Sequence, residues 1–190
     1  PVVYVDWPDE EHKARPPAYE NRQVKIEDGR PRKEEFNLST HGFAFVDHTS
    51  AVENFYSNKQ LKAIGYPEVQ TLIREHINCK SVLVFDHTIR TTSDVIIARH
   101  GVRQPVKAVH NDYTEKSAPR RVRDLLPNDQ LENVLSRRFA IIQVWRPIKQ
   151  IESDPLAICD GRSIPETGFI MLQRRYTNRT AEVYHICYNE

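Results

Sequence analysis

The sequence lacks the features that would assign it to several common protein classes. Its 27 basic and 26 acidic residues leave a formal charge of +1, so there is no electrostatic reason to expect a nucleic acid or an anionic membrane as a partner. No apolar run approaches the roughly 18–20 residues that span a bilayer, and the first residues do not resemble a signal peptide. We therefore expect a cytoplasmic protein with no membrane partner.

Cysteine is also scarce. Cys79, Cys159 and Cys187 are odd in number and far apart, and none belongs to a C-x-x-C pair, which predicts free thiols in a reducing compartment. Internal repeats and low-complexity segments are absent as well. What remains, with 39% hydrophobic and 28% charged residues over 190 positions, is the composition of an ordinary soluble enzyme.

The pattern along the chain predicts an arm followed by one domain. Residues 1–37 are polar and contain several prolines, which is typical of an arm laid over a core or of a partly ordered tail. Residues 38–190 form the predicted domain. We expect its helices early in the chain, at 49–61, 66–78 and 122–138, the last one interrupted near Pro127.

Short β-type runs dominate the later part of the chain. The expected strands are 42–46, 81–90, a short strand around 110–112, 139–148, 155–160, 168–176 and 182–188, with 91–105 as a connection or flap. Of these, 139–148 (FAIIQVWRPI) has the strongest strand pattern. Early helices and late strands favour an α+β protein built on an antiparallel β-sandwich or jelly roll.

The motif that carries chemistry is His110-Asn111-Asp112. A His and a carboxylate two residues apart on a strand project from one face and start roughly 6–7 Å apart, close enough to converge on one metal ion. They would supply two-thirds of the 2-His-1-carboxylate triad that binds Fe(II). The alternatives are a buried His–Asp hydrogen bond or a simple turn. Asp86-His87 is a rival pair, but adjacent strand residues point to opposite faces.

Several segments in the same order resemble those of the CmcJ/NvfI-type non-heme iron oxygenases, a family that includes cephalosporin methoxylase-related and gibberellin desaturase-like proteins. Together they cover roughly residues 40–190. The segments are FDHTIR (85–90), VHNDYT (109–114), Arg120 to Arg123 with Leu126-Pro127, RRFAIIQVWRPI (137–148), DPLAICDGRS (154–163) and the terminal EVYHICYNE.

The resemblance implies a double-stranded β-helix core (jelly-roll or cupin-like) with flanking helices. It implies Fe(II) as the metal, 2-oxoglutarate as co-substrate and O₂. His110 and Asp112 would be the first two iron ligands. The third, a His, is expected beyond Glu190, followed by an Arg-rich strand that binds the 2-oxoglutarate carboxylate.

Because no third ligand is evident before Glu190, the sequence leaves three explanations. The protein continues past this point, or His185 replaces the distal ligand, or the protein is not a competent iron enzyme. We favour the first explanation, because a barrel without its last strands would expose a sheet edge. His185 shares a face with Val183 and Cys187, which is more typical of a core or pocket-wall residue.

Further residues are candidates for binding the substrate or co-substrate, each with a structural alternative. Gln143 and Trp145 share a strand face, and Arg146 follows them. Arg146 could instead form an internal salt bridge with Asp160. The other candidates are His87, Arg90, Tyr113 and Thr114.

The function predicted is therefore an Fe(II)- and 2-oxoglutarate-dependent oxygenase that oxidises a small-molecule secondary metabolite by hydroxylation, desaturation or oxidative cyclisation. A homodimer is compatible with the sequence, and no nucleic acid is expected as a partner. One rival is an iron oxidase that needs no 2-oxoglutarate. The other is a catalytically silent jelly-roll module that binds a small molecule or a partner protein.

Overall fold

The computed structural model describes residues 2–4, 19–177 and 179–189. The chain forms two compact units, each assembled from separated stretches of sequence. The sheet unit comprises Pro1–Phe45, Val106–Ile141 and Ala157–Glu190, and the pocket unit comprises Val46–Pro105 and Ile142–Leu156. The arm predicted over residues 1–37 falls partly outside the described ranges and stays a prediction.

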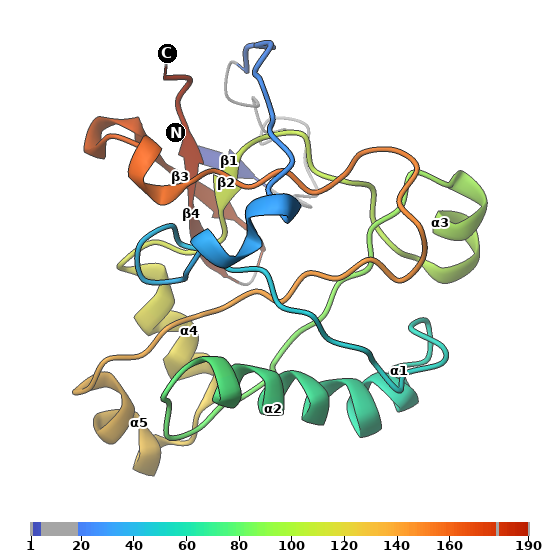
Figure 1. Ribbon diagram of the computed structural model, residues 1–190. Coiled ribbons are helices and arrows are strands. Elements are labelled where there is room, and N and C mark those ends of the chain that lie inside the picture. The colour runs from blue at the N-terminus through green and yellow to red at the C-terminus, as the bar shows by residue number, and fades with distance from the viewer. Residues whose placement is uncertain (1, 5–18, 178, 190) are drawn as a thin grey trace. The chain divides into compact units, whose positions relative to one another are not determined.

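Four strands form the sheet of the sheet unit, in the order β1-β3-β4-β2 (Figure 1). β3 (Phe169–Arg175) and β4 (Thr180–Ile186) form an antiparallel hairpin, as their alternating sequences predict. β1 (Val2–Tyr4) lies parallel to β3, and β2 (His110–Asn111) lies antiparallel to β4. The chain thereby brings position 110 beside the final strand.

The register of this sheet decides which side chains share a face. Residues directly opposite each other on neighbouring strands point to the same side. His110 lies opposite His185, and Leu172 lies opposite Val183. Leu172 is 2% exposed and Val183 is 4% exposed, so both belong to the core. The face that carries His110 and His185 is therefore continuous with the apolar core of the sheet unit.

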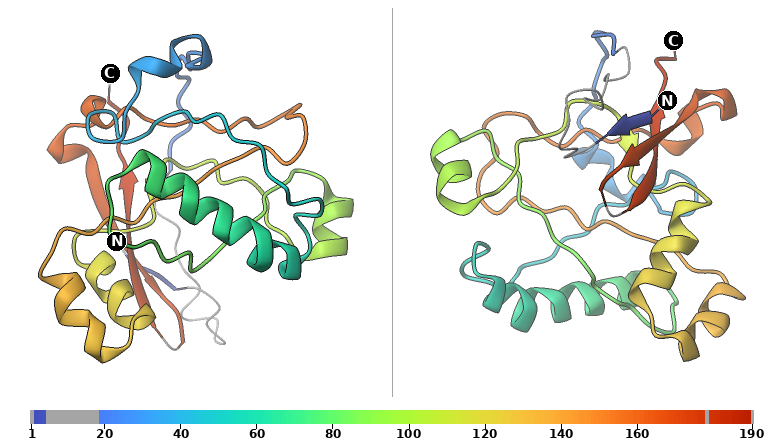
Figure 2. Two further views of the ribbon diagram at one scale, coloured as in Figure 1. Left: turned by 60° about the horizontal axis from the view of Figure 1, so that its bottom comes forward. Right: turned by 180° about the vertical axis from the view of Figure 1, so that it is seen from behind.

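Helix α4 (Ser117–Leu125) lies beside β4, where the short β2 no longer covers its edge, and all three views agree on this placement (Figures 1 and 2). The Ser117 hydroxyl donates to the Glu182 carbonyl at 2.8 Å, and the Arg120 guanidinium donates to the Thr180 carbonyl at 3.3 Å. These bonds satisfy strand carbonyls that have no ladder partner there. α4 thus closes the edge that β2 leaves open.

The predicted helix at 122–138 is two helices, and its break at Pro127 is confirmed. α5 (Asn128–Leu135) begins directly after that proline. The first helix begins at Ser117, five residues earlier than predicted. The reason is Thr114, whose hydroxyl accepts hydrogen bonds from the backbone amides of Lys116 and Ser117 and so organises the first turn.

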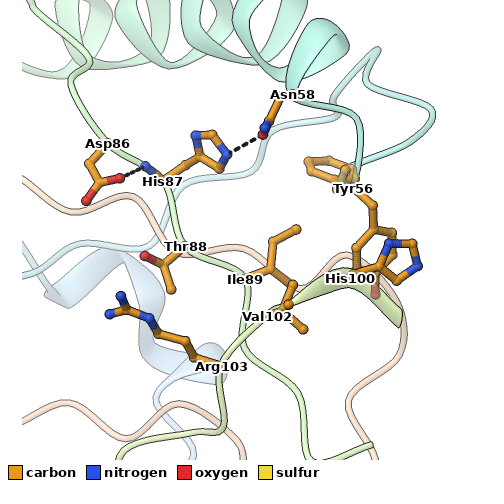
Figure 3. Close-up of a pocket in the computed structure, with 11 residues that line it drawn as sticks. Tyr56, Asn58, Asp86, His87, Thr88, Ile89, His100, Val102 and Arg103 are labelled. Carbon is orange, nitrogen blue, oxygen red and sulfur yellow. Dashed lines mark hydrogen bonds between the residues drawn. The ribbon is translucent and has the colours of Figure 1, made fainter. Parts of the chain in front are cut away.

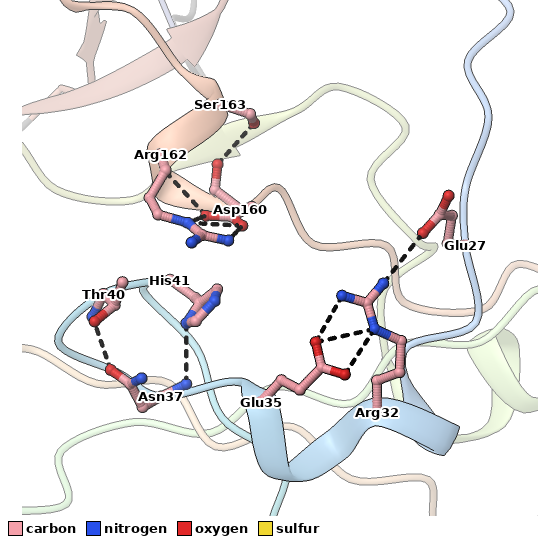
Figure 4. A network of polar contacts seen from close by, with 9 residues as sticks. All are labelled: Glu27, Arg32, Glu35, Asn37, Thr40, His41, Asp160, Arg162 and Ser163. Carbon is pink, nitrogen blue, oxygen red and sulfur yellow. Dashed lines mark hydrogen bonds and ion pairs between the residues drawn. The ribbon is translucent and has the colours of Figure 1, made fainter.

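A polar network joins the N-terminal part of the sheet unit to its later turns (Figure 4). The Gly161 amide donates to the His41 carbonyl at 2.8 Å. Beside it the Arg162 guanidinium binds the Asp160 carboxylate, which lowers the pKa of Asp160 to about 2. Arg162 is therefore a partner of Asp160 within the sheet unit, and the Arg146–Asp160 salt bridge stays a prediction. The short turns in this region are η2 (Arg30–Glu35), η4 (Gly161–Ser163) and η5 (Glu166–Gly168).

The pocket unit is built on one helical stretch, composed of α1 (Asn58–Gln60), η3 (Leu61–Gly65) and α2 (Tyr66–His76). Its buried side chains are Val52, Leu61 and Leu72. The helix predicted over 49–61 begins only at residue 58, where the Ser57 hydroxyl caps it by accepting from the Gln60 amide.

Ser50, at the start of the predicted range 49–61, caps no helix because its side chain binds a carboxylate. Its hydroxyl donates to the Glu68 carboxylate at 2.5 Å, and the Ala51 amide donates to the same carboxylate at 2.6 Å. The segment 91–105, predicted as a connection, contains helix α3 (Asp94–His100), which begins at a Ser93 cap and ends at Gly101 with φ 64°.

Four predicted strands are wrong for the described residues, because 42–46, 81–90, 139–148 and 155–160 are extended or irregular without forming strands. The pair Arg90–Arg103 forms only an isolated bridge. Sequence alternation sets which side chains share a face, but a strand also requires a neighbouring strand for its backbone hydrogen bonds. The ladder partners for these runs are not present among the residues that the structure describes.

The α+β class is confirmed, since helices accompany one mixed four-stranded sheet in the described ranges. A second sheet, which a double-stranded β-helix requires, is not formed by those residues.

Candidate functional site

His110 and Asp112 converge in the sheet unit. His110 Nε2 lies 3.3 Å from Asp112 Oδ1, and the two side chains are 20% and 43% exposed. β2 supplies the local reason: Asn111 pairs with Tyr184, so its neighbours on either side project toward the opposite face. The side chains of His110 and Asp112 therefore converge, as the spacing of the motif predicts.

The second nitrogen of His110 fixes the state of its ring. Nδ1 lies 2.8 Å from the Ala108 carbonyl oxygen, which can only accept, so Nδ1 carries a hydrogen. In the neutral ring Nε2 then presents its lone pair to Asp112. In the charged ring it donates a proton there. The hydrogen bond to Asp112 raises the pKa of His110, while burial and the charge of Arg174 oppose this.

A divalent cation fits between these two groups. An imidazole nitrogen and a carboxylate are ligand types that Fe(II) accepts. A carbonyl on the other ring nitrogen is the usual outer partner of a metal-binding His, because it holds the tautomer and the ring orientation. The pair therefore fits an iron site as two of its ligands.

No third ligand joins them among the described residues, where no group of three or more His, Cys, Asp or Glu side chains is placed to hold a metal ion. His185 lies beside His110, with its ring centroid 5.9 Å from that of His110 and the rings at 25°. This stacked arrangement does not aim both rings at one point, so His185 is not placed as a replacement for the distal ligand.

Two further predicted residues follow the pair. Tyr113 is half-buried, and its amide donates to the Asn111 side chain at 3.3 Å. Thr114 is 5% exposed, and its hydroxyl is used at the start of α4 and toward Glu182 at 3.3 Å. Thr114 is therefore tied into the structure beneath α4, whereas Tyr113 lies beside the pair.

His87 and the other predicted binding residues belong to the pocket unit, where a hollow of about 290 Å³ opens (Figure 3). His87 Nδ1 lies 2.8 Å from the Tyr66 hydroxyl, and Nε2 lies 3.1 Å from the Asn58 side-chain oxygen. Both ring nitrogens are thus engaged by neutral groups. The hollow is lined by Phe55, Tyr56, Asn58, Asp86, His87, Thr88, Ile89, His100, Gly101, Val102 and Arg103.

Asp86 and His87 do not converge as the rival pair would require. The Asp86 carboxylate accepts from the backbone amide of His87 at 2.8 Å, not from its ring. Burial and then the nearby Asp86 charge raise the pKa of Tyr66. Asp86 and His87 therefore form part of the pocket wall and do not converge on a common point.

The remaining candidates have structural partners within the pocket unit. Arg90 donates to the Gln104 carbonyl at 2.9 Å. The Trp145 indole donates to the Gln143 side chain at 3.0 Å, so these two side chains are together as predicted. Arg146 lies 2.6 Å from His48 Nδ1, which accepts from it.

Two residues near the pair owe their positions to the sheet register: His185, which the sequence offered as a replacement for the distal ligand, and Arg174, which the sequence did not single out. His185 lies directly opposite His110, and burial lowers its pKa. The charge of Arg174 adds to that lowering and opposes the raised pKa of His110. The alternation of EVYHICY places His185 on one face, but the register that brings β4 against β2 is not encoded in a local pattern.

Comparisons with known proteins agree on one relationship. A family model described as "Oxidoreductase/YMDC permease-like domain" matches residues 1–190. Oxidoreductase AN1597 of Emericella nidulans is 31% identical over 164 residues, which are 83% of this chain and 55% of that protein. The Fe(II)/2-oxoglutarate-dependent dioxygenase nvfI of Aspergillus novofumigatus is 30% identical over 158 residues, or 75% of this chain and 52% of that protein.

The fold is shared with a solved structure. The iron and alpha-ketoglutarate-dependent endoperoxidase NvfI superposes with a TM-score of 0.87 at 23% identity, covering 100% of this chain and 71% of the other. The chain spans about half the length of the curated relatives it matches. No helix in the described ranges is long and apolar enough to cross a bilayer.

Proposed function

The chain belongs to the family of NvfI-type Fe(II)/2-oxoglutarate oxygenases, matched by the oxidoreductase/YMDC permease-like model, and on this premise we propose that it is the iron-binding part of such an oxygenase. Its substrate would be a small molecule of secondary metabolism. The complete protein would have a jelly-roll core, and it would act alone or as a homodimer.

The observation that carries the proposal is the convergence of His110 Nε2 and Asp112 Oδ1 at 3.3 Å, with the Ala108 carbonyl fixing the imidazole. His110 and Asp112 would hold the iron. When bound, the iron supplies O₂ activation, and 2-oxoglutarate supplies the electrons by oxidative decarboxylation. The protein residues orient the ligands: Ala108 keeps Nε2 unprotonated toward the metal, and Asp112 neutralises part of its charge.

The third ligand, a His, and an Arg for the co-substrate carboxylate are proposed to lie beyond Glu190. This rests on the family resemblance and on relatives that are about twice the matched length. Contacts of the substrate or co-substrate with Gln143, Trp145, Arg146, His87, Arg90, Tyr113 and Thr114 stay predictions.

The test is turnover of the full-length protein under air with Fe(II), measured as succinate released from 2-oxoglutarate. We expect succinate in the wild type and at most background in His110→Ala and Asp112→Ala. His76→Gln is the control, because His76 is an exposed histidine at the end of α2 and should leave succinate release unchanged. Wild-type activity in either ligand variant would contradict the proposal.

Two rival functions are separated by the same assay. Product formation with iron and O₂ but without 2-oxoglutarate would identify the oxidase that draws electrons from its substrate. A protein that binds no Fe(II) at all would be the silent binding module.

A further inference from the structure

The hollow in the pocket unit has a wall that one helical stretch fixes in place (Figure 3). This stretch passes from α1 through the π turn η3 into α2, and it brings the Asn58 side chain and the Tyr66 hydroxyl to the two ring nitrogens of His87. In an α-helix, positions i and i+7 share a face. A π turn holds one residue more, so positions 58 and 66 share a face here. Single π turns inside α-helices occur frequently at functional sites.

The contacts of His87 leave a hydrogen-bond donor for a bound molecule. The Asn58 Oδ1 can only accept, so in the neutral ring Nε2 of His87 donates to it and Nδ1 accepts from the Tyr66 hydroxyl. The amide nitrogen of Asn58 then keeps hydrogens that no described residue accepts. Asn58 lines the hollow, so this donor is available there.

Two opposite charges also line the hollow. Arg103 is held beside Ile89, whose carbonyl accepts from the Arg103 amide at 3.1 Å. The Asp86 carboxylate accepts from the backbone amide of His87 at 2.8 Å. Among the described residues, neither charged group forms an ion pair, with the other or with a third group. Figure 3 shows both groups on the same side of the view.

The other side of that view holds an aromatic pair and open space. The rings of Tyr56 and His100 are stacked, with centroids 4.1 Å apart and planes at 21°. Gly101 also lines the hollow, and a Cβ atom there would meet no atom beyond its chain neighbours within 4 Å. The volume of about 290 Å³ is at the low end for small-molecule sites, which suits a molecule with one ring.

We propose that the hollow binds a small zwitterion of the amino-acid class. Its carboxylate accepts from the Arg103 guanidinium and the Asn58 amide, and its ammonium donates to Asp86. Its side chain lies against the Tyr56–His100 pair, where an apolar or aromatic group removes ring surface from water. A molecule with a single charge would leave Arg103 or Asp86 unmatched, whereas a zwitterion matches both.

The test is an NMR titration of the metal-free full-length protein with three probes that share a phenyl ring. L-phenylalanine carries both charges, 3-phenylpropanoate only the carboxylate, and 2-phenylethylamine only the ammonium. We expect saturable shifts of the Gly101 amide signal. L-phenylalanine should bind about tenfold more tightly than either other probe, because each lost hydrogen bond to a charged group costs about that factor.

Two variants assign the charges separately. Arg103→Gln should weaken L-phenylalanine and 3-phenylpropanoate about tenfold and leave 2-phenylethylamine unchanged. Asp86→Asn should weaken L-phenylalanine and 2-phenylethylamine by a similar factor and leave 3-phenylpropanoate unchanged. Asn at position 86 still accepts from the His87 amide, so this variant should unfold thermally like the wild type.

Arg99→Gln and Glu75→Gln are the matched controls, because they remove the same charges from exposed positions of α3 and α2 that do not line the hollow. Both should bind L-phenylalanine as the wild type does. Three results would overturn the site: a wild type that does not bind L-phenylalanine, a single-charge probe that binds as tightly, or a control that loses as much affinity as Arg103→Gln.

The site goes beyond the proposed function, because its residues all belong to the pocket unit and its ligand needs no metal. L-phenylalanine binding without succinate release would refute the oxygenase and retain this site. Succinate release without L-phenylalanine binding would refute the site and retain the oxygenase.

Discussion

Two His–Asp motifs of this chain, His110-Asn111-Asp112 and Asp86-His87, form chemically different sites, one in each unit. In the sheet unit, His110 and Asp112 direct their side chains at each other, 3.3 Å apart. In the pocket unit, the Asp86 carboxylate binds the backbone amide of His87, and the His87 ring is engaged by Tyr66 and Asn58. Spacing by one intervening residue on a paired strand gives convergence, whereas direct adjacency does not.

The two motifs also differ in whether the histidine ring nitrogens are available to bind a ligand. His87 has a neutral partner on each nitrogen, so a metal would have to displace a satisfied hydrogen bond. His110 faces a carboxylate through Nε2, which in the neutral ring presents a lone pair that a metal ion can bind. The comparison therefore assigns metal chemistry to the sheet unit and a role in the pocket wall to His87.

The largest expected effect tests this contrast through metal binding. His110→Ala and Asp112→Ala should each weaken binding of Fe(II), measured anaerobically by calorimetry, by more than about a hundredfold, since even changes to outer partners of metal ligands cost 10–100-fold. His87→Ala should change it by less than about twofold. A loss in His87→Ala comparable to that in His110→Ala would erase the distinction between the two units.

A second contrast compares two serines, each of which donates to an acceptor in its own unit. Ser117 is 7% exposed and bonds both the Glu182 carbonyl and the Thr114 amide, so Ser117→Ala should lower the free energy of unfolding by about 1–3 kcal/mol. Ser50 is half-buried and bonds Glu68, and Ser50→Ala should cost about 0.5–1 kcal/mol. Urea unfolding measures both. A loss below about 0.5 kcal/mol in Ser117→Ala would contradict a stabilising edge contact of α4.

The smallest effect concerns the half-buried Asp160 in the sheet unit. Its hydrogen bonds from the Arg162 side chain and amide lower its pKa to about 2. A carboxyl group with a lowered pKa contributes stability that is present above its unfolded value and is lost as the pH falls through the folded value. NMR titration should give a midpoint near 2 in the wild type. Arg162→Gln should return it toward the ordinary value, and a wild-type midpoint already at that value would contradict the ion pair.

The parts of the fold that could be predicted were those determined locally. The α2 helix after Tyr66-Pro67, the break at Pro127 and the β3–β4 hairpin all follow from periodicity and from proline chemistry. The run at 139–148 has a clear strand pattern but forms no strand, because its pattern cannot supply a ladder partner.

The same division applies to the site. The convergence of His110 and Asp112 could be predicted because it depends on two residues only two positions apart, at the end of one short strand. The positions of His185 and Arg174 could not, since they depend on the register between β2, β4 and β3, which are far apart in the sequence.

The most direct test is the location of iron itself. Crystals of the full-length protein grown with Fe(II) under argon should show one strong anomalous peak at the iron edge, bonded to His110 Nε2 and to the Asp112 carboxylate. The Nδ1 contact with the Ala108 carbonyl should remain. A peak at Asp86 and His87, or an unchanged His110–Asp112 contact with iron bound elsewhere, would contradict the assignment of the metal site to the sheet unit.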